Sequence, residues 1–264
     1  MRTGSLPFVG ELEDEMRHAG LQSSDCARVL MIILHGVNSN VQMTTFWLMT
    51  VLLSDAVLMD RIRSETTPVF EALQAKSRSG AVSESDRHGI FRDLMMQSCP
   101  LLNSVFNEVV RVYSTGASVR HTTRNVTIGN KRVPAGTDII MPHRQLLVDQ
   151  GAFGEDAHIV NPERFIGSGK GRSLERHHFY RPFGGGTSMC SGRITGRYEV
   201  MGFAAIVLHR YNLELVKEGA MAFDGTVGIP LPRIDLKKPS LGVSKQVEGD
   251  DMIVEVRKRS TALW

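Results

Sequence analysis

A glycine-rich segment that ends in a single cysteine constrains this sequence more than any other feature. Residues 183–192 read FGGGTSMCSG, and a helical pattern follows from Arg193 to Arg210. Glycines allow tight turns and the close approach of a flat ligand. A thiolate held just before a helix N-terminus is stabilised by the helix dipole and by backbone N–H donors. The segment therefore has the chemistry that a cysteine-ligated metal needs, although a small buried cysteine in a turn is the commoner interpretation of such a loop alone.

Composition limits the classes of protein to which the chain can belong. With 264 residues, 42% of them hydrophobic, it is long enough to bury a core. The net charge of +3 is small and the basic residues are scattered, so nucleic acid is not expected as a partner. Cys26, Cys99 and Cys190 lie far apart, which excludes zinc ribbons and dithiol motifs and fits a reducing compartment.

The N-terminal half raises the question of membrane segments. Residues 1–20 are polar and charged, so they do not resemble a signal peptide. The apolar stretch 27–53 is interrupted by polar residues 35–42, whereas a spanning helix needs ~20 mostly apolar residues. We favour a long buried helix over a membrane span.

Hydrophobic periodicity predicts a mainly α fold with small β elements in one structural unit, residues 1–264. Helices are expected from Asp25 to about Ser54, within Ala56–Leu73 as one or two pieces, from Pro100 to about Tyr113, and over Arg193–Arg210. A short hairpin is expected around Gly129, a strand near Met252–Val256, and loops over Lys76–Asp86 and Gly151–Arg176.

Two further motifs precede the cysteine segment. Residues 108–111 read EVVR and residues 162–165 read PERF. Glu108 and Arg111 share one helix face because they are three positions apart. If they are buried they must be paired and hydrogen-bonded, whereas an exposed surface pair would be the ordinary interpretation of this motif alone.

Together the three motifs resemble the cytochrome P450 family, the haem-thiolate monooxygenases. The family's ligand loop reads F-x-x-G-x-R-x-C-x-G, and E-x-x-R and P-E-R-F precede it in the same order. The matching loop positions here are Phe183, Gly186, Cys190 and Gly192. The resemblance covers about residues 22–260 and implies the C-terminal portion of the cytochrome P450 fold, with heme b as cofactor and Cys190 as the metal ligand.

The resemblance also implies roles for three arginines. Arg164 would complete a triad with Glu108 and Arg111 behind the haem. Arg120 stands where the family often places a cation for a haem propionate, and a guanidinium suits a carboxylate because it pairs bidentately. A solvated arginine at a strand end is the alternative for Arg120.

The sequence departs from the family at two sites. Ser188 stands where the ligand loop usually carries an arginine, which removes one propionate contact. The family's oxygen-binding motif, A/G-G-x-D/E-T-T, corresponds to HGVNSN at residues 35–40, which contains no carboxylate. The candidate catalytic residues are therefore Asn38, Ser39 and Asn40. The motif at residues 35–40 is similar to that of the family branch with sterol 7α-hydroxylases and prostacyclin synthase. This branch includes both oxygenases and isomerases.

The activity that the resemblance implies is monooxygenation of a lipophilic small molecule, such as a sterol, a fatty acid or a terpenoid-like secondary metabolite. Electrons would come from a flavoprotein of the NADPH-cytochrome P450 reductase type, and the family is usually found at the endoplasmic reticulum membrane. A non-oxygenating isomerase or dehydratase, and an inactive truncated remnant, stay as alternatives. The resemblance implies family members roughly twice as long, so we expect this sequence to lack the helices that roof the substrate pocket.

Overall fold

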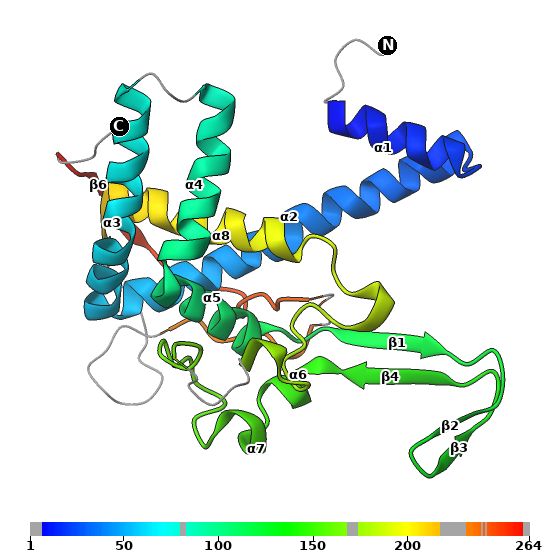
Figure 1. The fold of residues 1–264 in the computed structure, drawn as a ribbon. Coiled ribbons are helices and arrows are strands. Elements are labelled where there is room, and N and C mark those ends of the chain that lie inside the picture. The colour runs from blue at the N-terminus through cyan, green and yellow to red at the C-terminus, as the bar shows by residue number, and fades with distance from the viewer. Residues whose placement is uncertain are drawn as a thin grey trace. The chain divides into compact units, whose positions relative to one another are not determined.

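The computed structural model describes residues 7–79, 83–167, 174–216, 231–238, 240 and 242–260, and it is mainly helical (Figure 1). The helices are α1 Pro7–His18, α2 Ser23–Ser54, α3 Ala56–Arg78, α4 Glu84–Ser98, α5 Pro100–Tyr113, α6 His143–Leu147, α7 Gln150–Phe153 and α8 Arg193–Arg210. The strands are β1 Ala117–His121, β2 Val126–Ile128, β3 Lys131–Val133, β4 Asp138–Pro142, β5 Tyr211–Leu215 and β6 Val254–Lys258, and short 3₁₀ turns span Leu174–Arg176 and Gly186–Ser188. By their internal contacts the residues fall into two units, 1–40 and 41–264.

The first unit contains α1 and the beginning of α2. Helix α1 ends at His18, and the turn after it contains Gly20, whose φ of +85° places it in the left-handed region that glycine adopts without strain. The N–H groups of Gly20 and Leu21 donate to the carbonyls of Arg17 and Met16, the pattern of a Schellman cap. This cap stops α1 and turns the chain into α2.

The beginning of α2 differs from expectation. Met31, Ile32 and Val37 are 65%, 71% and 52% exposed, so the prediction of a buried helix is wrong for this part of α2. The prediction of a buried helix is confirmed from Val41 onward, where Trp47, Leu48 and Leu52 are fully buried. Among the described residues, no single helix has the length and hydropathy to cross a membrane. Only α2 and α3 taken together pass on length and composition, and they are bent by 112° at their junction.

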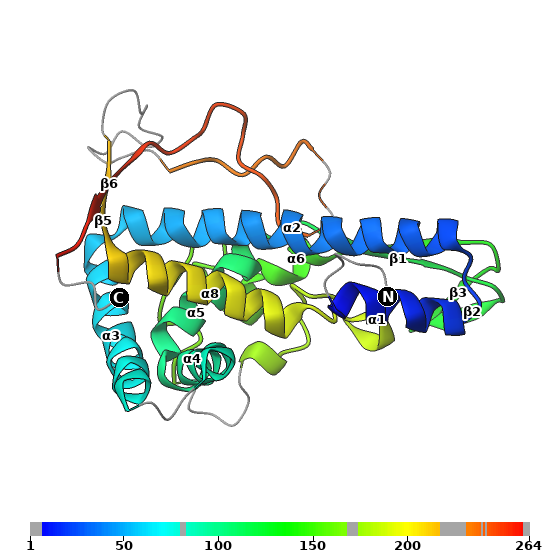
Figure 2. The same ribbon diagram turned by 90° about the horizontal axis from the view of Figure 1, so that it is seen from above.

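The second unit buries its core between the end of α2 and helices α3, α5 and α8. Figure 2 shows α4 nearly end-on, to one side of α8. Helix α5 is buried around almost its whole circumference: every residue from Ser104 to Val112 is buried, including the polar face that carries Glu108 and Arg111. The indole of Trp47 stacks on Tyr113 at 4.0 Å and donates to the Ser244 carbonyl at 2.7 Å, which fixes α2 to α5 and to the C-terminal segment.

Three small antiparallel pairs complete this unit: β1 with β4, β2 with β3, and β5 with β6. Gly129, with a φ of +60°, and Asn130 form the tight turn between β2 and β3, so the predicted hairpin is confirmed. The predicted helices over α2, α3, α5 and α8 are confirmed as well, α3 as one continuous helix despite Pro68. Helix α4 shortens the expected loop at residues 76–86, and the β1–β4 pair was not predicted.

Candidate functional site

The most deeply buried charges of the second unit form a salt-bridge cluster on α5. Glu108 and Arg111 are both fully buried, and they pair bidentately at 2.6 Å and 2.9 Å. The remaining N–H groups of Arg111 donate to the carbonyls of Leu147, Ala157 and Ile159. Every hydrogen-bonding direction of this guanidinium is therefore used inside the chain, as a buried charge requires.

Arg164, from the PERF segment, approaches the same carboxylate from the other side. Its Nε lies 3.1 Å from Glu108 Oε1, and its Nη2 lies 2.8 Å from Asp156 Oδ2. Burial alone would lower the pKa of Arg164, but the hydrogen bond to Asp156 and the charge of Glu108 leave it raised. The hydrogen bond from Arg164 in turn lowers the pKa of Asp156. The structure thus brings Glu108, Arg111 and Arg164 into one cluster, in which two arginines face two carboxylates.

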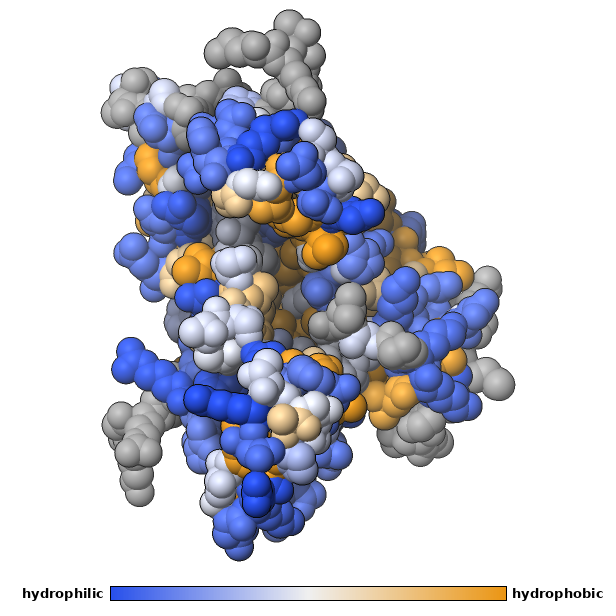
Figure 3. Space-filling view, turned by 90° about the vertical axis from the view of Figure 1, so that its right-hand side faces the viewer, coloured by the Kyte–Doolittle hydropathy of each residue, from blue (hydrophilic) through white to orange (hydrophobic). Residues whose placement is uncertain are grey.

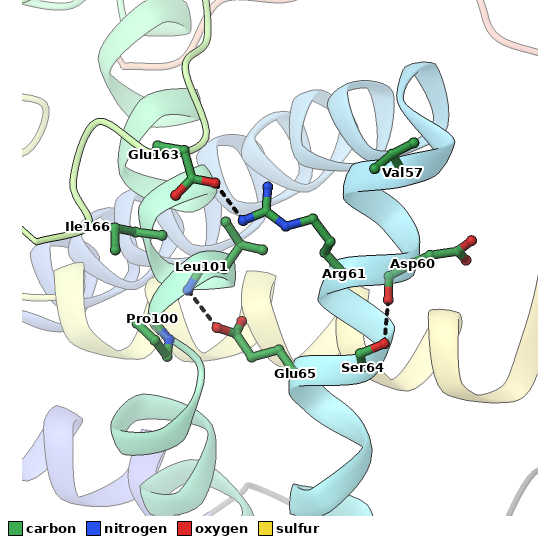
Figure 4. A pocket seen from close by; sticks show the side chains of 9 residues that line it. All are labelled: Val57, Asp60, Arg61, Ser64, Glu65, Pro100, Leu101, Glu163 and Ile166. Atoms are coloured by element: carbon green, nitrogen blue, oxygen red, sulfur yellow. Dashed lines mark hydrogen bonds and ion pairs between the residues drawn. The ribbon is translucent and has the colours of Figure 1, made fainter.

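A surface groove of about 660 Å³ beside the cluster shows how α3 holds these elements in place (Figure 4). Arg61 points from α3 to Glu163, the neighbour of Arg164, and pairs with it at 2.5 Å. Glu65 points from α3 to the first turn of α5 and accepts from the backbone N–H groups of Leu101 and Leu102 at 2.7 Å and 2.9 Å. These N–H groups have no helical acceptor of their own, so α3 caps the helix that carries Glu108.

Cys190 lies on an exposed loop whose backbone is closed on itself. Its N–H donates to the Phe183 carbonyl at 3.0 Å, and Gly184 and Gly186 have φ values of +74° and +69°. A side chain at either glycine would be strained. At Gly192, a Cβ would lie 3.9 Å from the sulfur of Cys190. The thiol of Cys190 is exposed, and α8 begins three residues later, at Arg193.

Strand β1 contributes two polar side chains next to this loop. Arg120 donates to the hydroxyl of Ser188, the residue that replaces the arginine of the family's loop. Ser118, on the same face of β1, is 2.8 Å from His143 Nε2, and His143 lies against Gly184. Burial lowers the pKa of His143. His143 was not predicted as a site residue, because nothing in its local sequence distinguishes it.

The other two cysteines are buried and lie outside this loop. Cys99 is the residue before α5 and its side chain makes no capping hydrogen bond; burial raises the pKa of its thiol to about 12. A thiol with such a pKa is almost entirely protonated at neutral pH and is a poor ligand. Cys26 belongs to the first unit. Cys190 is thus the one exposed thiol among the described residues.

The candidate catalytic residues Asn38, Ser39 and Asn40 lie in the first unit, on a regular part of α2. Asn38 Nδ2 donates to the Leu34 carbonyl at 2.7 Å, and the Ser39 hydroxyl donates to the His35 carbonyl at 2.8 Å. Such bonds to the preceding turn hold polar side chains against their own helix. The side-chain oxygens of both residues keep their capacity as acceptors.

The donor set around Cys190 suits a haem. A single thiolate of the protein could hold a haem, because the porphyrin supplies the other ligands that the iron needs. Arg120 offers a guanidinium for a propionate. Exposed apolar side chains such as Met189 and Ile194 flank the loop, and Figure 3 shows apolar surface interrupting the hydrophilic surface on the face it presents. A large apolar ring system would cover surface of this kind.

Comparisons with known proteins agree with this geometry. The family model described as Cytochrome P450 matches residues 9–236. The chain is 28% identical over 205 residues to cytochrome P450 monooxygenase nodJ of Hypoxylon pulicicidum, covering 75% of this chain and 38% of that protein. It is 25% identical over 231 residues to cholesterol 7-alpha-monooxygenase of Cricetulus griseus, covering 82% and 42%.

A solved structure has the same fold. It is a zebra fish cytochrome P450 with abiraterone, which superposes with a TM-score of 0.57 at 24% identity and covers 82% of this chain and 44% of that chain. The chain spans less than half the length of each of these three relatives.

Proposed function

Because the chain belongs to the cytochrome P450 family, we propose that it forms the haem-thiolate portion of a monooxygenase that acts on a lipophilic small molecule. The observation that carries the proposal is the exposed thiol of Cys190 on a closed glycine loop, with Arg120 against the same loop. A sterol, a fatty acid or a terpenoid-like secondary metabolite is the proposed substrate class. Similarity to a sterol monooxygenase and to a fungal monooxygenase supports this choice.

Each residue of the loop would have a separate task. Bound haem would supply the oxygen chemistry, which a thiolate ligand favours by donating electron density. Cys190 would provide the thiolate, and the bond from its N–H to the Phe183 carbonyl holds the loop in a shape that presents the sulfur outward. Arg120 would pair with a propionate, and Gly192 leaves room beside the sulfur. The cluster of Glu108, Arg111 and Arg164 would stabilise the fold of the chain behind the haem.

On the distal side of the haem, the side chains of Asn38, Ser39 and Asn40 would bind water and transfer protons. An amide and a hydroxyl can orient a water molecule and pass a proton through it, but neither supplies a proton as a carboxylic acid does. The absence of a carboxylate from residues 35–40 favours a second candidate function, a haem isomerase or dehydratase that needs no external electrons. A monooxygenase would instead need electrons, and we propose a flavoprotein of the NADPH-cytochrome P450 reductase type as their source.

The first experiment is the absorption spectrum of the purified chain, supplied with haem, reduced and exposed to carbon monoxide. Thiolate ligation gives a strongly red-shifted Soret band. We expect this band in the parent chain and in Cys99→Ala, and its loss in Cys190→Ala. A parent chain without the band contradicts the proposal and favours a remnant without haem. Turnover with reductase and oxygen, compared with turnover of a peroxide substrate without them, separates the monooxygenase from the isomerase.

A further inference from the structure

A second cavity, of about 210 Å³, lies in the second unit. Its walls come from three helices that pack against one another, α3, α4 and α8. Figure 1 shows α3 and α4 side by side with α8 crossing them, and Figure 2 shows the same grouping from above. None of its lining residues belongs to the salt-bridge cluster or to the cysteine loop.

Aromatic rings form one side of this cavity. Phe70 of α3 lies 5.4 Å from Phe91 of α4 between ring centroids, and it stacks on His209 of α8 at 4.0 Å. Tyr198 of α8 lies 6.3 Å from Phe91 in an edge-on arrangement. Ile206 adds an aliphatic wall. These ring faces and the aliphatic side chain suit a ligand whose aromatic or aliphatic part is transferred from water into the cavity.

The polar groups of the cavity carry charge of one sign. Arg87 and Arg210 are cationic, and His88 and His209 are their neighbours in the lining. No aspartate or glutamate is among the lining side chains that the structure describes. The pKa of His209 is lowered by burial first and then by Arg259 and Arg210, so positive charge surrounds this ring. A cavity with cations and no carboxylate has an electrostatic preference for an anion.

Arg87 is a cation of this lining without a described partner. Within the described part of the chain it forms no ion pair, and its buried Nε–H makes no hydrogen bond. A guanidinium without a counter-ion gains a charge-assisted hydrogen bond when an anion lies beside it. Arg87 lines the same cavity as the aromatic rings, so a ligand with a charged end and an apolar body would contact both.

We propose that this cavity binds a small carboxylic acid with an aromatic or short aliphatic body, whose carboxylate accepts from Arg87. The volume is below the ~300–1,000 Å³ of pockets for drug-sized ligands, so the occupant is of the size of a phenyl-substituted short-chain acid. Its carboxylate meets Arg87 and its body lies against Phe70, Phe91 and Tyr198. The site is independent of the haem function and would exist whether or not the chain is an oxygenase.

Calorimetric titration of the full chain with 3-phenylpropionate and with 3-phenylpropanol tests the proposal, because the two probes differ in charge and hardly in shape. We expect the acid to bind. The alcohol should bind at least about 10-fold more weakly, because it loses a hydrogen bond to a charged group. Arg87→Gln should weaken binding of the acid by about 10-fold or more and leave the alcohol nearly unchanged. Ile206→Trp should abolish binding of both by filling the cavity.

The matched control is Arg92→Gln on the same helix, because Arg92 is exposed and pairs with Asp93 outside the cavity. It should bind the acid as the parent does. Thermal melting of each variant shows that it is folded, and an unchanged Soret band during titration of haem-loaded protein separates this cavity from the haem. Equal binding of acid and alcohol, an equal loss in Arg92→Gln and Arg87→Gln, or no binding of either probe would overturn the proposal.

Discussion

The salt-bridge cluster on α5 and the cysteine loop before α8 both contain ionisable side chains, but those of the cluster are buried and that of the loop is exposed. In the cluster, the side chains of Glu108 and Arg111 are fully buried, and their partners all come from the chain itself. In the loop, the backbone is hydrogen-bonded internally while the thiol of Cys190 is exposed. The cluster is complete without a ligand, and the loop presents a donor outward.

This difference separates stability from function. A buried ion pair is expensive to break because one charge is left without compensation, so the cluster should govern folding. An exposed thiol makes few contacts, so its removal should affect ligand binding and hardly the fold. Variants in the two regions should therefore fall into two classes, which stability and haem content measured on the same sample will separate.

The largest effect is expected for Arg111→Ala and Glu108→Ala. Each leaves a buried charge without its partner, at a cost of about 3–5 kcal/mol in the free energy of unfolding. That is a large share of the stability of a typical domain, so the yield of folded protein should fall. Denaturant unfolding of the chain without added haem measures the loss.

The matched control for this prediction is Arg61→Ala. Arg61 also forms an ion pair with a glutamate, but both side chains are about half exposed. Its removal should cost roughly 0–1 kcal/mol. If Arg61→Ala and Arg111→Ala lose the same stability, the cluster has no special place in the fold.

A smaller loss is expected for Arg164→Ala, about 1–3 kcal/mol, because Glu108 keeps Arg111 and the backbone N–H of Asn161 as partners. The variant also gives a local signal. Arg164 holds the pKa of Asp156 below its usual value, so this carboxylate stabilises the fold at pH values above its unfolded pKa and loses that effect as the pH falls through its folded pKa. NMR titration should show the pKa of Asp156 rising in the variant, and an unchanged value would show that Arg164 does not pair with it in solution.

Some of this arrangement was predictable from sequence and some was not. The spacing of Glu108 and Arg111 and the glycine pattern before Cys190 are local. They therefore predicted that Glu108 and Arg111 share one helix face and that the glycines before Cys190 form a tight turn. Glu65 could not be predicted as the cap of α5, because it lies 36 residues from Leu101 and reaches it only through the packing of α3. His143 is near the loop for the same kind of reason, the unpredicted pairing of β1 with β4. Contacts between distant segments depend on tertiary packing, which periodicity does not encode.

Glu65→Gln should have a modest effect, a loss of about 1 kcal/mol, since an amide offers one oxygen where the carboxylate offers two to Leu101 and Leu102. Burial raises the pKa of Glu65 above its ordinary value of 4.5. Its contribution to stability is therefore fullest below the unfolded pKa and declines as the pH rises through the folded pKa. The deficit of the variant against the parent should shrink over that interval in unfolding curves measured at several pH values. A deficit that grows with pH would contradict the raised pKa.

The smallest effect on stability, and the sharpest test of the comparison, is expected for Cys190→Ala. The exposed thiol buries little surface, and alanine fits wherever cysteine does, so the free energy of unfolding without haem should change by less than about 0.5 kcal/mol. The same variant should lose the red-shifted Soret band entirely, because the exposed ligand is gone and the thiol of Cys99 is held protonated by burial. Cys99→Ala is the inverse control: it should keep the band and lose stability, since Cys99 is buried beside Met95. If Cys190→Ala unfolds as readily as Arg111→Ala, the loop is part of what holds the fold together, and the separation of the two regions fails.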